Sequence, residues 1–371
     1  MSYYLQALLL ATIAAFVFRP QRATKLLPVL IAIFWFIGVS FIFWRYGSFG
    51  QLSFYQNDQR FHWTIVRQVL STDFGFTFNK LNSLRAPYTL PAFVLSKIGF
   101  DPTLSLKFVS LCCALGNFML IDRFLSLRSF KFLVLYFWII AGPISVFFSL
   151  LALRETMMLL CVTQIFIGSS HGGRITSLLV LLVLRPHLAA AIIFGLFWGW
   201  IFERLQLKWH LITTLATAIL PVYLGTIAFL VGGLMVSGTP MELEHGLFLR
   251  EGIIQVFSAF AGLQFLTVAY QTVEFSTTSL LIIRLIFPEI VMIPLLFAAC
   301  SILHSQAFPR LKLSVLATFV FFTSISSGTE FLSVRQSLPM MSIMGLAVIL
   351  TFFQPATNQE NSRNVKHLTG V

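Results

Sequence analysis

Long apolar runs, separated by short polar or basic segments, occupy most of the chain. A helix needs about 20 apolar residues to cross the hydrocarbon core of a bilayer, and many of these runs approach that length. We therefore predict an all-α, polytopic membrane protein with about 10–12 membrane helices, some of them short or broken. The predicted helices span 3–18, 27–44, 103–121, 132–151, 156–170, 175–184, 188–202, 211–236, 280–300, 313–326 and 337–353, with a weaker apolar stretch at 253–270.

Several of these runs are too short to cross a bilayer alone. The segment 88–100 contains Pro91 and Lys97, which indicates a re-entrant or interfacial helix. Short or interrupted helices are expected where a protein builds a cavity within the membrane, because irregular backbone is tolerated only there. Because we find no internal repeat or flexible linker, residues 1–353 are predicted to form one transmembrane domain and 354–371 a polar cytoplasmic tail.

The composition supports this prediction. Hydrophobic residues make up 57% of the chain and charged residues only 10%, whereas an ordinary soluble domain has about 25% charged residues. So few charges could not cover the surface of a soluble globule. The interpretations as a soluble enzyme, a nucleic-acid binder, a disordered chain or a secreted disulfide-stabilised protein are therefore excluded.

The net charge of +12 is not a nucleic-acid signal here, because the basic residues lie mostly at the ends of apolar runs. That pattern is typical of loops that flank membrane spans near an anionic lipid surface. The four cysteines lie within apolar runs and the seven histidines are dispersed, so neither type predicts a metal site. The predicted location is the plasma membrane, with several spans.

Five basic segments set the predicted orientation, since short basic loops stay in the cytoplasm. The prediction requires that 175–202 forms a broken hairpin and that 253–279 does not fully cross. The long segment 45–102 and the polar groups at 154–155, 185–187 and 330–335 are then extracytoplasmic. The five cytoplasmic segments are 19–25, 123–131, 204–208, 310–312 and the tail with Arg363 and Lys366.

The first extracytoplasmic loop holds the first group of candidate site residues. Polar residues from Arg60 to Ser71 follow helical spacing, which predicts an amphipathic helix on the membrane surface. Asp58 would lie at the start of this helix, beside Arg60 and His62. Asp58 could act as a general base or a metal ligand. Alternatively, Asn57 or Asp58 simply caps the helix.

Two further groups interrupt strongly apolar sequence. Arg154 and Glu155 lie between two apolar runs. An unpaired charge within a membrane is energetically costly, so a pair of opposite charges there is a candidate functional site. The alternative is a surface ion pair in an interfacial hairpin.

A proline breaks a second long run at Arg185-Pro186-His187, and a guanidinium there could bind phosphate oxygens bidentately. Arg185 could instead bind carbonyls of its own broken helix. Arg335, before the last span, is a second candidate anion contact or a side chain that extends to the interface.

This arrangement resembles membrane glycosyltransferases of the GT-C class and bacterial polysaccharide polymerases of the Wzy and EpsG type. Those proteins have an acidic residue in a long first extracytoplasmic loop, here Asp58, and another in the next outer loop, here Glu155. The resemblance covers roughly 27–205 and 330–345. Two departures stand out, because the first acidic motif is the single Asp58 instead of a pair of acids, and no soluble C-terminal domain follows.

The resemblance implies a transferase or polymerase that uses a polyprenyl-phosphate-linked sugar at the extracytoplasmic face. Asp58 would deprotonate the acceptor hydroxyl, and Glu155 would orient the acceptor or base, or hold a divalent cation. The leaving lipid phosphate would be neutralised by cations at the site. The implied substrate and phosphate contacts are Arg60, His62, Arg154, Arg185, His187 and Arg335.

Two other functions fit the same residues. A transporter or flippase for a lipid-linked saccharide or small anion would also use broken helices and buried arginines, although such proteins usually contain repeats. A non-catalytic membrane subunit of an envelope-assembly complex would tolerate replacement of Asp58, Glu155 and Arg185. The predicted partners are the lipid bilayer and a polyprenyl-phosphate-linked saccharide, and not nucleic acid.

Overall fold

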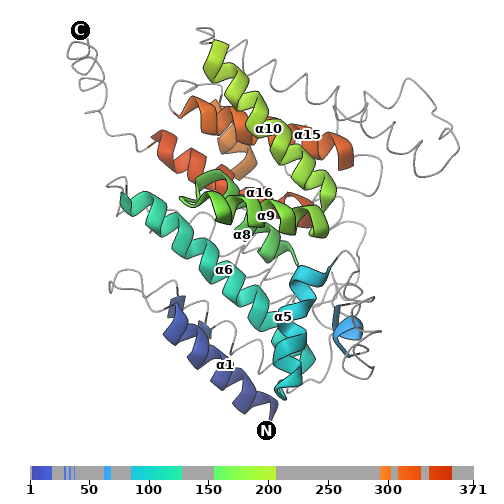
Figure 1. The fold of residues 1–371 in the computed structure, drawn as a ribbon. Coiled ribbons are helices and arrows are strands. Elements are labelled where there is room, and N and C mark those ends of the chain that lie inside the picture. The colour runs from blue at the N-terminus through green and yellow to red at the C-terminus, as the bar shows by residue number, and fades with distance from the viewer. Residues whose placement is uncertain are drawn as a thin grey trace, which may run out of the picture.

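The computed structural model is helical throughout the part of the chain that it describes, with no strand there (Figure 1). The described residues are 2–18, 29–30, 33–34, 37, 62–67, 85–127, 154–205, 293–301, 308–326 and 334–352. The principal helices are α1 (Tyr3–Val17), α5 (Ala86–Lys97), α6 (Pro102–Leu127), α8 (Glu155–Ile167), α9 (His171–Leu184), α10 (Pro186–Leu205), α15 (Pro309–Ser326) and α16 (Val334–Phe352).

These helices confirm the predicted helical runs that can be compared, except that the run 156–170 ends as a helix at Ile167 and turns at 168–170. The run 103–121 belongs to a longer helix, α6, which has 26 residues. The segment 88–100 forms the short helix α5, with Pro91 inside it. The predicted helices 132–151, 211–236 and 253–270 lie outside the described residues, as do most of 27–44 and 280–292.

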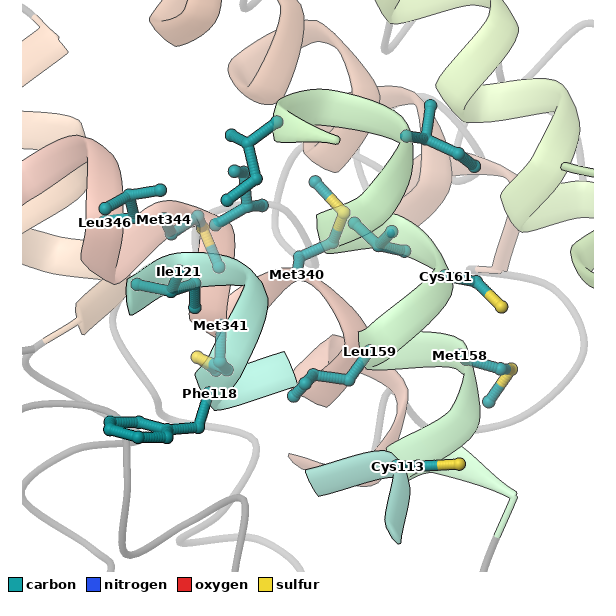
Figure 2. Packing of buried hydrophobic residues seen from close by; sticks show 14 of the residues in the cluster. Cys113, Phe118, Ile121, Met158, Leu159, Cys161, Met340, Met341, Met344 and Leu346 are labelled. Carbon is teal, nitrogen blue, oxygen red and sulfur yellow. The ribbon is translucent and has the colours of Figure 1, made fainter. Parts of the chain in front are cut away.

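Part of the hydrophobic core lies where α8 packs against α6 and α16 (Figure 2). Sulfur-containing side chains are frequent there, because flexible thioethers fill the irregular gaps between helices. One buried hydrogen bond crosses this core, from Asn117 Nδ2 on α6 to Ser342 Oγ on α16 at 3.1 Å. The sulfur-containing residues are Cys113, Met158, Cys161, Met340, Met341 and Met344.

The helices α10 and α15 pack side by side and run antiparallel (Figure 1). His187 at the start of α10 stacks on Phe322 late in α15. At the opposite end, Arg310 Nη1 lies 2.7 Å from Glu203 Oε2. The start of the predicted cytoplasmic segment 204–208 and the segment 310–312 therefore lie at one end of this helix pair, away from His187.

The helices α8 and α9 form an antiparallel hairpin that turns at Gly168–Ser170. The Ser170 hydroxyl caps α9 by accepting a hydrogen bond from the backbone N–H of Gly173 at 3.3 Å. With 13 and 14 residues, these helices are each about 20 Å long, which is shorter than a bilayer core of about 30 Å. The hairpin thus brings residues 154–155 next to 184–185.

Two helical segments of the described chain are long and apolar enough to cross a membrane, Pro102–Leu125 and Pro186–Arg204. The second begins directly after a break in the chain. Arg185 has φ −162° and ψ 81°, which is outside the helical region, so α9 and α10 are separate helices. Pro186 starts α10 because the first turn of a helix needs no N–H from that residue.

Candidate functional site

Two of the predicted motifs meet at the open end of the α8–α9 hairpin. Arg154 precedes α8 and Arg185 follows α9, so the antiparallel hairpin places the two side by side. Arg154 Nη1 donates a hydrogen bond of 2.9 Å to the carbonyl oxygen of Leu184. That carbonyl ends α9 and has no partner within its own helix. Arg154 therefore links the start of α8 to the end of α9.

Glu155, the first residue of α8, is fully buried at this point, with a relative exposure of 0%. Three guanidinium groups act electrostatically on its carboxylate, those of Arg154, Arg185 and Arg85. A negative charge in the first turn of a helix is also favoured by the helix dipole. We call Glu155 and these three basic residues the arginine cluster: Arg85, Arg154, Arg185 and Glu155.

Arg85 is the member of the arginine cluster that the sequence analysis missed. It lies directly before α5 and is half-buried. Burial and the charge of Arg154 lower the pKa of Arg85, whereas the charge of Glu155 raises it. The available signal was a lone arginine beside the Pro87 of a short apolar helix, which is the same pattern that singled out Arg185.

Arg185 is buried and contacts His187, two residues along the chain, and Phe322 of α15. Its guanidinium carbon lies 5.3 Å from the centre of the Phe322 ring, and the His187 ring stacks on the same phenylalanine at 5.7 Å. Arg185 Nε donates to His187 Nε2 at 3.0 Å. Because an accepting ring nitrogen carries no proton, this geometry requires a neutral His187.

A second buried polar group adjoins the arginine cluster through Tyr88 of α5. The Tyr88 hydroxyl lies 2.8 Å from Ser110 Oγ and donates to the Leu106 carbonyl at 3.2 Å. It also interacts electrostatically with Glu155. His62, from the first loop, is fully buried and packs edge-on against the Tyr88 ring at 5.1 Å. His62 therefore contacts Tyr88, the residue that adjoins the arginine cluster.

The side chains of three other predicted site residues lie outside the part of the chain that the structure describes. Asp58 and Arg60 lie outside the described residues, so their positions stay predictions. A short helical stretch at 62–67 overlaps the predicted amphipathic helix. Arg335 belongs to the first turn of α16, where the structure describes the backbone.

The arginine cluster is suited to binding an anion. Guanidinium groups present several N–H donors in a plane and bind phosphate or carboxylate oxygens in pairs. A divalent cation at Glu155 would meet the repulsion of three guanidinium charges. Within the described residues, no group of three or more His, Cys, Asp or Glu side chains could hold a metal ion. No family model, curated protein or solved structure matches the chain.

Proposed function

We propose that the chain is a polytopic membrane protein that transfers or polymerises sugars carried on a polyprenyl-phosphate lipid, at the extracytoplasmic face of the plasma membrane. The observation that carries the proposal is the arginine cluster. Two motifs that resemble those of GT-C and Wzy-type enzymes, at 154–155 and 185–187, lie side by side there, with Glu155 and Arg185 buried. A lipid phosphate that leaves during sugar transfer needs such a group of fixed positive charges.

The surfaces of the helices support the membrane assignment. Several described helices expose apolar side chains at spacings of three and four residues, so each exposes an apolar stripe. A soluble monomer rarely leaves so much apolar surface uncovered, whereas lipid would cover it. The stripes are Leu5, Leu9 and Ile13 on α1, Leu90 and Val94 on α5, Ile175, Leu179 and Leu182 on α9, and Ile193, Leu196, Phe197 and Trp200 on α10.

In this proposal each group has a separate task. Arg154 and Arg185 bind the phosphate of the donor, and Asp58 takes the proton of the acceptor hydroxyl. Glu155 orients the acceptor or the base, and the buried position of its carboxylate among guanidiniums favours that role over cation binding. His187 keeps the Arg185 guanidinium in place by accepting its Nε hydrogen bond.

The test is transfer of sugar from a lipid-linked donor by the purified protein, compared with the Asp58→Asn variant. Asp58→Asn should abolish transfer while thermal unfolding stays unchanged, because an amide cannot accept the proton. Full activity of this variant would remove Asp58 as the base. Movement of the lipid-linked saccharide across vesicles without any product would instead identify a flippase.

A further inference from the structure

We propose that His187 acts on the bound anion through Arg185 and does not contact the anion itself. As a neutral acceptor, His187 fixes the Arg185 guanidinium, and protonation of His187 releases it. His187 is then a positioning residue, in contrast to the phosphate contact that the resemblance implies. The inference rests on the proposed function, because it concerns how the same site holds the donor phosphate.

The backbone of Arg185 is fixed from both sides. Its N–H donates to the Leu181 carbonyl at 2.7 Å, at the end of α9. Its own carbonyl accepts from the N–H groups of Leu188 and Ala189 at 3.0 and 3.2 Å, at the start of α10. Between these bonds, the ring of Pro186 locks its own φ angle. The backbone from which the Arg185 side chain extends is therefore rigid, so only the side chain remains to be positioned.

Two aromatic rings position the Arg185 side chain. An arginine has several rotatable bonds, and holding its guanidinium in one place costs conformational entropy. His187 Nε2 accepts from Arg185 Nε at 3.0 Å, and the centre of the Phe322 ring lies 5.3 Å from the guanidinium carbon. The His187 and Phe322 rings are nearly parallel, with an angle of 8° between them. Because Phe322 is fully buried on α15, this helix provides the surface against which both other side chains lie.

The direction of the Arg185–His187 hydrogen bond decides what His187 can do. Phosphate oxygens accept hydrogen bonds, so a ring nitrogen that itself accepts from Arg185 cannot bind them. When His187 takes up a proton, both ring nitrogens become donors. Two positively charged donors cannot stay 3.0 Å apart at a site that is largely shielded from water. The guanidinium would then lose its contact with His187 and its fixed place beside Phe322.

The charged groups around His187 do not provide a substitute for this hydrogen bond. Arg185 and Arg154, which precedes α8, act electrostatically on His187, and both guanidiniums stay charged. From α15, His187 meets the uncharged Phe322. The other charged or titratable side chains that the structure describes on α9, α10 and on α15 up to Phe322 lie at the far ends of these helices: His171, Arg174, Glu203, Arg204, Arg310 and Lys312.

The sign of the pH dependence separates positioning from direct contact. A histidine that binds an anion directly becomes positively charged on acidification, so binding becomes tighter. Proton uptake by Glu155 would have the same sign, because it removes a negative charge that acts on the guanidiniums. Loss of the hydrogen bond between Arg185 and His187 predicts the opposite, namely weaker binding at low pH.

The experiment measures the dissociation constant of farnesyl methyl phosphate with the full-length protein in mild detergent, between about pH 8 and about pH 4. This probe is a phosphodiester with one ionisable oxygen, so its own charge stays constant over the range. His187→Gln keeps an accepting oxygen that does not titrate, and His187→Phe keeps an aromatic ring but has no acceptor. His171→Gln is the matched control, because it removes an exposed histidine at the other end of α9.

We expect the wild type and His171→Gln to bind the probe about tenfold more weakly at the acidic end, as for loss of a hydrogen bond to a charged group. His187→Gln should bind it with nearly constant affinity, whereas His187→Phe and Arg185→Gln should bind it weakly at every pH. Constant or tighter binding by the wild type on acidification, an equal loss in His187→Gln, or full affinity in Arg185→Gln would overturn the inference.

Thermal unfolding at each pH shows whether each variant is folded. If His187→Phe does not unfold cooperatively, the pH profiles of the wild type and His187→Gln decide, since both keep an acceptor beside Arg185 at pH 8.

Dimethyl phosphate has no prenyl chain, so it distinguishes a lipid-borne phosphate from a free one. It should bind more weakly than the farnesyl probe, and equal binding would contradict a lipid donor. The assay contains no acceptor sugar, so it is independent of sugar transfer. Weaker binding at low pH without any transfer would refute the proposed function alone, and transfer with a probe affinity that does not fall on acidification would refute this inference alone.

Discussion

Glu155 is the residue on which the arrangement of the arginine cluster depends most. Its carboxylate is fully buried and interacts with three guanidinium groups. Such a carboxylate stabilises the protein by reducing repulsion among the neighbouring guanidiniums, of which Arg185 is buried and Arg85 and Arg154 are half-buried. A neutral side chain of the same shape would keep the packing and remove only the charge.

Glu155→Gln should therefore lower the free energy of unfolding by about 3–5 kcal/mol, as expected when one partner of a buried ionic group is removed. Thermal or denaturant unfolding in detergent measures this loss. Glu203→Gln is the control, because Glu203 pairs with Arg310 at an exposed position and should cost at most about 1 kcal/mol. Equal effects of the two substitutions would show that Glu155 does not hold the cluster.

Phe322 should support binding at the cluster without touching the anion. Its ring lies against both Arg185 and His187. Phe322→Leu should weaken binding of a lipid-phosphate probe, farnesyl methyl phosphate, by about three- to tenfold, because Arg185 loses its cation–π contact. Phe321→Leu is the matched control, since Phe321 stacks on Phe194 instead. Equal binding of the probe by both leucine variants would show that Phe322 does not support Arg185 in binding the anion.

The sequence predicted part of this group for a physical reason. Arg154, Glu155 and Arg185 interrupt apolar runs, and a charge in such a place requires a partner. Arg85 was missed because it belongs to a long polar segment, in which one arginine does not stand out. Phe322 was missed because an aromatic residue in an apolar run gives no signal of its own, and its role comes only from packing.

The short hairpin α8–α9 and the long pair α10–α15 position the cluster together. The apolar runs predicted these helices, because a run of apolar residues marks a buried or lipid-facing helix wherever it packs. The pairings could not be predicted, since they depend on which helix surfaces are complementary. For α10 and α15 the close approach involves Gly195 and Gly199, which face Ser314 and Thr318.

Gly195→Ala should destabilise the protein by about 1–3 kcal/mol, as expected for overpacking at a tight contact. An added Cβ would lie 2.5 Å from the Ser314 carbonyl oxygen and 2.9 Å from the Thr318 nitrogen. Backbone atoms cannot move aside as a flexible side chain can, so the two helices would have to separate. The midpoint of thermal unfolding measures the effect.

Gly172→Ala is the control for this substitution. Gly172 is also helical, but an added Cβ there would meet only Ser170 Oγ at 3.8 Å, an ordinary contact. Since alanine favours the helix over glycine by up to about 1 kcal/mol, Gly172→Ala should be neutral or stabilising. A loss of stability in both variants would indicate that glycine itself, rather than close packing, is needed.

Over the whole molecule, the two ends of the α10–α15 pair differ in chemistry, and this difference predicts an orientation. One end carries Glu203, Arg204 and Arg310 at exposed positions. The other end carries His187 and Phe322, beside the buried arginine cluster. Exposed basic residues at the end of a membrane helix favour the cytoplasmic side. The cluster would then lie near the extracytoplasmic face, where the proposed donor is used.

Single cysteines introduced at Asn82, Ser170 and Arg310 test this orientation with a membrane-impermeant maleimide. The native cysteines Cys112, Cys113, Cys161 and Cys300 are first replaced by serine, although all of them are buried or half-buried. Asn82→Cys should react in intact cells. Ser170→Cys, at the hairpin turn, and Arg310→Cys should react only after the cells are permeabilised.

Each of the three cysteines reports on which side of the membrane a different segment lies. Asn82 tests the first long loop, Ser170 the hairpin, and Arg310 the basic end of α15. Because α8 and α9 have 13 and 14 residues, they cover only about 20 Å of a core of about 30 Å. Labelling of Ser170→Cys in intact cells would therefore place the hairpin turn outside and the cluster deeper in the membrane. A lipid-linked donor would then have to approach from the cytoplasmic side, contrary to the proposed function.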